Sequence, residues 1–179
     1  MGVQLYSVTE TSSGYPLLAD VYFGKKRPRQ ASEFEHSYNV VKELLTQANL
    51  LNNGYHRYVD NFYTSPVLGE QFFTQKTLLT GSLRSNRKGI PLMLKSAKPK
   101  VGTFFYATKC PLLAFSWKEK EFQRSPCLML TTGIVAVMVK RTCRNGQTKE
   151  LSEAISSYNQ HMRGVNLMHG PGPGCSKHG

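Results

Sequence analysis

The chain has 179 residues, enough for one domain with a substantial core but too few for two full-sized domains. It carries 23 Lys and Arg against 11 Asp and Glu, so its net charge of +12 favours polyanionic partners. No apolar run approaches the ~18 residues that cross a bilayer, and no charged segment leads into an apolar one near Met1, so we expect neither a membrane span nor a secretion signal.

The first elements expected are a β-hairpin and a helix. Two β-type runs, residues 3–9 and 17–23, flank a turn-forming segment, which is typical of a hairpin. Between residues 36 and 51 the apolar side chains recur at helical spacing, and Asn-Asn-Gly at 52–54 is a stop signal. An amphipathic helix is therefore expected after the hairpin.

A short strand and a second helix come next. The strand is expected over residues 55–59 and is followed directly by Asp60. Thr64 or Ser65 can cap the next helix, because a hydroxyl oxygen accepts a hydrogen bond from a free backbone N–H, and Pro66 suits the first helical turn. The apolar face expected for this helix consists of Val67, Leu68, Phe72 and Phe73.

The composition changes after residue 83. A β-like run over 77–83 is followed by four more strand candidates, at 103–108, 112–117, 127–132 and 134–141, without any helical period between them. We expect a β-rich insertion over 84–148, a last helix within 149–169 that covers 149–162, and a disordered tail over 170–179, which is rich in Gly and Pro and has nothing to bury.

This order of elements indicates an α/β fold. It is typical of a ribonuclease H-like mixed sheet with flanking helices, here interrupted by the β-rich insertion, although many α/β folds begin in the same way. Residues 1–83 would form the first part of that core and 149–169 its last helix. In that architecture, carboxylates at strand ends and on a late helix converge on two Mg²⁺ ions.

Longer motifs are more specific, and they resemble those of piggyBac-type transposases. An Asp after a strand is most often a turn residue, but YHRYVDNFYTS at 55–65 resembles the second catalytic motif of that family. The resemblance continues in register with GSLRSNRKGIP at 81–91, WKEK at 117–120, YNQHMRGVN at 158–166 and the hairpin at 11–24. Five motifs in the same order over nearly the whole chain argue against coincidence.

The resemblance implies an Asp triad at positions 10, 60 and 166, where this chain has Glu10, Asp60 and Asn166. Glu10 keeps the charge but places it about 1.5 Å further out, against a tolerance of ~0.5 Å for catalytic geometry. Asn166 lacks a negative charge that should face a divalent cation. A further family Asp falls at His169, and imidazole is a poor ligand for Mg²⁺. With two of the three Asp replaced, we expect no competent catalysis.

The resemblance also implies a geometry. Glu10 and Asp60 should end neighbouring strands, with their carboxyl groups within about 8 Å of each other, as two metal ions ~3.5–4 Å apart require. If a metal binds at all, we expect Mg²⁺ held by Asp60 and Glu10, and most simply no bound metal.

The distribution of charge favours a DNA contact surface. Between Glu70 and Glu119 the chain has nine bases and no acid, whereas an ordinary surface intersperses both signs. In the resembling family the segment around Arg84 contacts DNA. The candidate contacts are Arg84, Arg87, Lys88, Lys95, Lys98 and Lys100. The alternative is that this charge only keeps the chain soluble.

Three functional hypotheses follow. The first is a piggyBac transposable element-derived protein of the DDE superfamily, nuclear by family resemblance, from a decayed or domesticated transposon. The helical region and the cysteine-rich end of the family have no counterpart here, and the departure after Val165 suggests a truncation or frameshift. The second is a DNA-binding module with weak, non-specific affinity. The third, ranked lowest, is a metal-dependent strand-transfer enzyme using Glu10, Asp60 and Asn166. A full-length transposase relative is a further expected partner.

Overall fold

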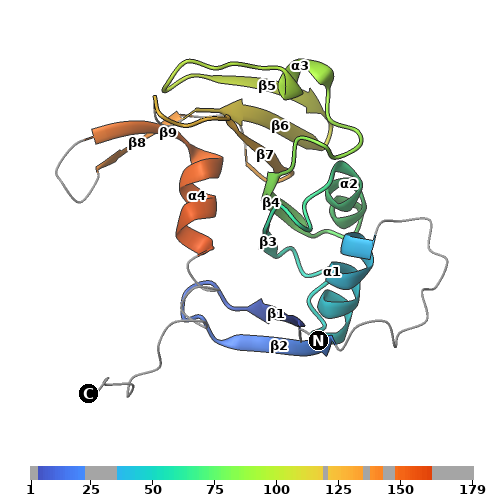
Figure 1. The fold of residues 1–179 in the computed structure, drawn as a ribbon. Coiled ribbons are helices and arrows are strands. Elements are labelled where there is room, and N and C mark those ends of the chain that lie inside the picture. Colours follow the sequence, from blue (N-terminus) through green and yellow to red (C-terminus); the bar gives the residue numbers. More distant parts are fainter. Residues whose placement is uncertain (1–3, 23–35, 119–120, 135–137, 143–147, 163–179) are drawn as a thin grey trace, which may run out of the picture.

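A computed structural model describes residues 4–22, 36–118, 121–134, 138–142 and 148–162 (Figure 1). None of the helices in these ranges is both long and apolar enough to cross a membrane. The elements are β1 (Gln4–Thr9), β2 (Pro16–Tyr22), α1 (His36–Gln47), β3 (His56–Val59), α2 (Pro66–Thr74), β4 (Leu78–Leu83), α3 (Leu92–Lys95), β5 (Phe104–Lys109), β6 (Leu112–Trp117), β7 (Cys127–Thr131), β8 (Met138–Thr142), β9 (Thr148–Ser152) and α4 (Glu153–His161).

The expected hairpin is confirmed. Strands β1 and β2 pair antiparallel, with Tyr6 opposite Asp20, and they form a two-stranded sheet of their own. Tyr6 is buried in one cluster with Val40 and Leu44 of α1. Helix α1 therefore covers the hairpin on one side and packs against the main core on the other.

The main sheet has five strands in the order β3-β4-β7-β6-β5. Strands β3 and β4 are parallel, and the other neighbours in this sheet are antiparallel, so the sheet is mixed. The parallel pair needs a crossover connection, which α2 provides. The ends of β3 and β4 consequently lie at the same edge of the sheet, and Asp60 follows the first of them.

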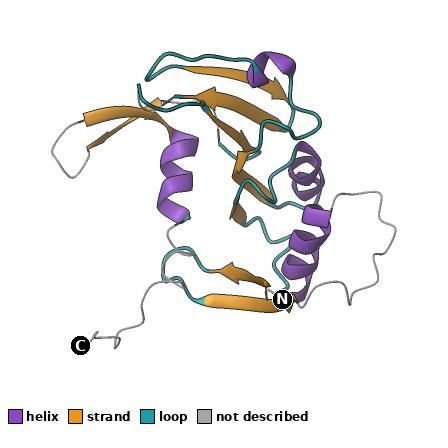
Figure 2. Ribbon diagram, viewed as in Figure 1, coloured by secondary structure: helices purple, strands orange, loops and turns teal. Residues whose placement is uncertain are grey.

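Helices cover both faces of this sheet (Figure 2). On one face Leu68 and Phe72 of α2 are fully buried in the larger core. On the other face, Ala154 and Ile155 of α4 pack in a cluster with Phe115, Trp117 and Met129. The mixed α/β class expected from the sequence is confirmed.

The first half of the chain follows the local sequence signals closely. Ser65 caps α2 by accepting the Leu68 N–H at 3.2 Å, with Pro66 at the first turn. The expected apolar face of α2 is only half right, because Val67 and Phe73 are 42% and 43% exposed. Gly69 lies between the two buried positions and brings the helix close to β6.

The second half shows more differences. The strands expected over 103–132 are confirmed, but β7 pairs with β4, so the main sheet continues across residue 84. Whether residues 84–148 are an insertion in the family's sense stays a prediction. Residues 148–152 form β9 rather than the start of a helix, and α4 begins only at Glu153. The expected disordered tail over 170–179 lies outside the described residues.

Candidate active site and its basic surroundings

Asp60 begins a tight turn directly after β3. Its backbone oxygen accepts hydrogen bonds from the N–H groups of Tyr63 at 3.0 Å and Thr64 at 3.1 Å, and from the Thr64 hydroxyl at 2.9 Å. Its side chain is exposed, and Oδ1 accepts the Asn61 N–H at 2.6 Å. Because a carboxylate offers about four acceptor sites, Asp60 has capacity left for a cation or another donor.

Helix α4 docks beside this turn. The hydroxyl groups of Tyr58 and Ser157 are 2.6 Å apart, and those of Ser82 and Tyr158 are 3.2 Å apart. Burial first, and to a lesser extent the negative charge of Asp60, raise the pKa of Tyr158. Burial, then Tyr6 and Asp60, raise the pKa of Tyr63 to about 12. The charge of Asp60 therefore acts on Tyr158 of α4 as well as on Tyr63 of its own turn. This agrees with the expectation that a late helix lies near Asp60.

Three stacked rings strengthen this docking. Tyr58 lies between His56 and His161, with ring centroids 4.6 Å and 4.4 Å away and nearly parallel planes. The two histidines are 105 positions apart in the sequence, and both are half-buried. The stack joins β3 to α4.

A chain of hydrogen bonds holds His56 from the other side. Gly133 N–H donates to the Thr131 hydroxyl at 3.3 Å, which is 2.6 Å from the Thr80 hydroxyl, which is 2.8 Å from Nε2 of His56. Every hydroxyl proton in this chain has an acceptor when Nε2 of His56 accepts, which requires a neutral ring. Burial and then the charge of His161 lower the pKa of His56 to about 4, which agrees with that assignment.

Glu10, the other candidate carboxylate, is occupied by its own turn. One oxygen accepts from the backbone N–H of Ser12 at 3.1 Å and from its hydroxyl, and the other accepts from the N–H of Ser13 at 2.7 Å and from its hydroxyl. The two hydroxyls, followed by the two N–H groups, lower the pKa of Glu10 to about 2. Four donors fill the four acceptor sites of the carboxylate.

The predicted geometry of the two carboxylates is therefore wrong in one respect. The hairpin and β3 belong to different sheets, so Glu10 and Asp60 do not end neighbouring strands of one sheet. The physical reason is that β1 pairs only with β2 in the described chain, while its inner face packs on α1 and Tyr63.

The described side chains offer few ligands for the two Mg²⁺ ions that the resemblance implies. Among the described residues no three His, Cys, Asp or Glu side chains come together as a metal site. Asp60 fits a hard cation, but Glu10 does not while its oxygens accept four hydrogen bonds. Asn166 and His169 lie outside the described residues.

The hydrogen bonding of Glu10 leads to a first prediction. By NMR titration the Glu10 carboxyl should have a pKa of about 2, moving toward 4.5 when Ser12 and Ser13 are both changed to alanine. Because the folded-state pKa is the lower one, this turn stabilises the fold above pH 4.5 and the contribution disappears as the pH falls toward 2. Thr11→Ala in the same turn is the control and should leave the pKa unchanged. A wild-type pKa near 4.5 would contradict the saturated carboxylate.

Two of the candidate DNA contacts bind the Asp60 turn itself. Arg84 donates from Nε to Oδ1 of Asn61 at 2.9 Å, and its guanidinium lies over the Phe62 ring, 5.4 Å from the centroid. Arg87 is half-buried and donates from Nη2 to the Phe62 carbonyl. Part of the role that the sequence assigned to DNA is therefore structural.

The other four candidates, Lys88, Lys95, Lys98 and Lys100, are exposed. Ile90 and Leu94 are buried on either side of Pro91 and anchor this irregular segment to the main core. Lys95 ends α3, and Pro99 is buried between Lys98 and Lys100. The segment thus presents its lysines to solvent while its apolar residues hold it in place.

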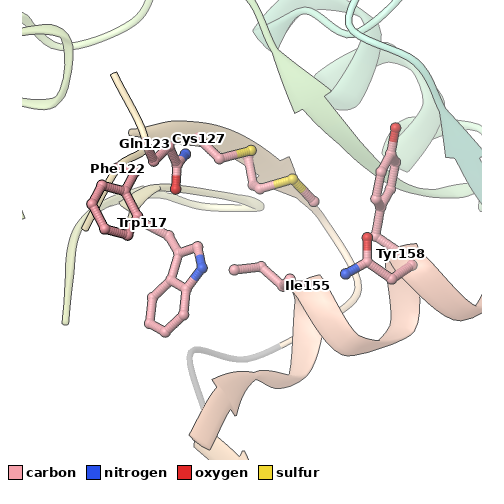
Figure 3. A pocket seen from close by; sticks show the side chains of 8 residues that line it. Trp117, Phe122, Gln123, Cys127, Ile155 and Tyr158 are labelled. Atoms are coloured by element: carbon pink, nitrogen blue, oxygen red, sulfur yellow. The ribbon is translucent and has the colours of Figure 1, made fainter. Parts of the chain in front are cut away.

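An open pocket of about 430 Å³ lies on the α4 side of the sheet (Figure 3). The figure shows the side chain of Ile155 pointing toward Trp117, with Phe122 beside Trp117 and Tyr158 at the opposite end. Its lining is completed by Gln123, Cys127, Met129 and Asn159. Trp117 itself is buried, with only 3% of its surface exposed. None of the described residues that line it carries a charge.

Known proteins resemble this chain in sequence and in structure. Residues 1–170 match a family model described as Transposase IS4. The solved structure of a piggyBac transposase synaptic complex with hairpin DNA, determined by cryo-EM, is similar with a TM-score of 0.75 and 24% sequence identity. The similarity covers 93% of this chain but 33% of that transposase, so the chain spans about a third of its length.

Proposed function

We propose that this chain, which belongs to the Transposase IS4 family and has the fold of a piggyBac transposase, is a catalytic-core region without competent catalysis. The resemblance of its motifs to piggyBac-type transposases agrees with both findings. In this proposal the mixed sheet with α1, α2 and α4 is the ribonuclease H-like core, and Asp60 stands where the second carboxylate of the family stands.

The observation that carries the proposal is the saturation of Glu10. Its two oxygens accept four hydrogen bonds from Ser12 and Ser13, so a metal ion would have to displace them. The sequence places Asn at the third family position, which removes another anion. Among the family's acid positions that the structure describes, Asp60 alone has acceptor capacity facing solvent.

A plasmid-nicking assay tests this proposal. The purified chain should not nick supercoiled DNA in Mg²⁺ or Mn²⁺ above the level of its Asp60→Ala variant, while an active piggyBac transposase serves as the positive control. Metal-dependent nicking that disappears in Asp60→Ala would show that Glu10, Asp60 and the third position still support catalysis. Adding Glu10→Asp and Asn166→Asp tests whether the missing carboxylates alone account for inactivity.

A second candidate function, non-specific DNA binding, is favoured by the exposed lysines of residues 88–100. The similar transposase structure is itself a complex with hairpin DNA. If about three to six phosphates are neutralised, a plot of the logarithm of the binding constant against the logarithm of the salt concentration should have a slope between about −3 and −5. Anisotropy titration of a duplex at several salt concentrations measures this slope, and a slope near zero would contradict DNA binding.

Location and partners belong to the same proposal. We infer that the chain acts in the nucleus and that it can pair with a full-length transposase relative. Microscopy of the tagged chain and co-purification with such a relative test these two points separately.

A further inference from the structure

Arg84 is held in one orientation beside Asp60. Strands β3 and β4 are parallel, so the residues that follow them, Asp60 and Arg84, leave the sheet at the same edge. Nε of Arg84 donates to Oδ1 of Asn61 at 2.9 Å, and the guanidinium stacks over Phe62. A hydrogen bond fixes one edge of the guanidinium plane and a ring fixes one face.

The remaining donors of Arg84 are available to a ligand. The bond to Asn61 uses Nε, and within the described chain no partner is recorded for the two Nη groups of this exposed side chain. Two Nη groups in one plane form a fork that matches two oxygens of a phosphate. An exposed arginine normally loses side-chain entropy when it binds, but here much of that loss has already occurred on folding.

Asn61 connects this fork to Asp60. Its backbone N–H donates to Oδ1 of Asp60 at 2.6 Å, while its side chain accepts from Arg84. Arg87 donates to the Phe62 carbonyl and so helps to hold the same turn in place. The positions of Asp60 and of the Arg84 guanidinium are thus set by two consecutive residues.

We propose that Asn61 and Phe62 are positioning residues that preorganise the Arg84 guanidinium, so that its two Nη groups meet a backbone phosphate at the Asp60 edge in one orientation. This inference rests on the proposed DNA binding and deepens it. It assigns Arg84 a defined phosphate contact, in contrast to the lysines, whose flexible side chains contribute charge without fixed geometry.

The test combines salt-dependent DNA binding with a double-mutant cycle. Arg84→Ala should lower the steepness of the salt slope by about 0.9. Asn61→Ala should weaken binding about three- to tenfold, and Phe62→Leu by a similar factor, because either change frees the side chain of Arg84. The double variant of Asn61→Ala with Arg84→Ala should bind no more weakly than Arg84→Ala alone, since Asn61 acts through Arg84.

Arg84→Lys separates charge from geometry. It should keep the salt slope but bind more weakly, and Asn61→Ala should then have little further effect. If Asn61→Ala and Phe62→Leu both leave affinity and slope unchanged while remaining folded by thermal unfolding, the positioning role is wrong. If Arg84→Ala changes nothing while the wild type binds DNA, the phosphate contact is wrong. If the wild type binds no DNA even at low salt, both the proposed DNA binding and this inference fail.

Discussion

Changing Gly81 to alanine is expected to destabilise the fold by about 2–4 kcal/mol, because there is no space for a Cβ atom at this position. That atom would lie 2.6 Å from the backbone oxygen of Val59 and closer still to the Thr64 hydroxyl. Val59 is the β3 partner of Gly81, so its carbonyl cannot move away without disturbing the parallel pairing. The damage would fall on Val59, directly before Asp60, and on Thr64, at the end of the turn that Asp60 begins.

Urea unfolding measures this effect, and Gly69→Ala is the matched control. A Cβ at Gly69 would also lie too close to a neighbour, at 2.8 Å, but that neighbour is the terminal methyl of Leu112, which can rotate. Alanine also gains up to about 1 kcal/mol over glycine within a helix such as α2. We expect Gly69→Ala to change the free energy of unfolding by less than about 1.5 kcal/mol. Equal destabilisation by the two variants would show that the approach of β4 to the Asp60 turn is not tight.

The contrast between these two glycines also shows how far local sequence signals reach. The start of α2 could be predicted because Ser65 and Pro66 act on their own backbone within three residues. The close approach at Gly81 could not, because it depends on the pairing of β3 with β4 across a crossover helix. The same holds for β7, whose pairing with β4 joins Thr80 to a residue 51 positions later.

The candidate site also has features that adjacent residues predict and features that only the folded structure shows. The motif around Asp60 and the end of β3 could be predicted from adjacent residues, and the structure places Asp60 there. The roles of Glu10 and Arg84 could not be predicted in full from residue type. A glutamate that could bind metal instead accepts hydrogen bonds from two serines, and an arginine assigned to DNA also holds Asn61. The hydrogen bonds of Glu10 compete with metal binding, whereas the bond from Arg84 to Asn61 uses only Nε and leaves its two Nη groups for a phosphate.

The second large effect is expected on DNA binding, from the exposed lysines of residues 88–100. Changing Lys95, Lys98 and Lys100 to glutamine should make the salt slope of DNA binding less steep by up to about 2.7, at 0.9 for each phosphate contact. At about 0.1 M salt this corresponds to an affinity loss of roughly one to nearly three orders of magnitude. All three side chains are exposed, so their loss removes charge without removing packing.

A charge-matched variant distinguishes a defined surface from the overall charge. Changing Lys42, Lys76 and Arg124 to glutamine also removes three exposed positive charges, from α1 and from loops outside residues 88–100. If the segment around α3 faces the phosphates, the first triple variant should lose most of the slope and the second should lose little of it. If both variants weaken binding equally, the attraction comes from the +12 net charge as a whole. Residues 88–100 would then contribute to binding only as part of that net charge and would not form a contact surface of their own.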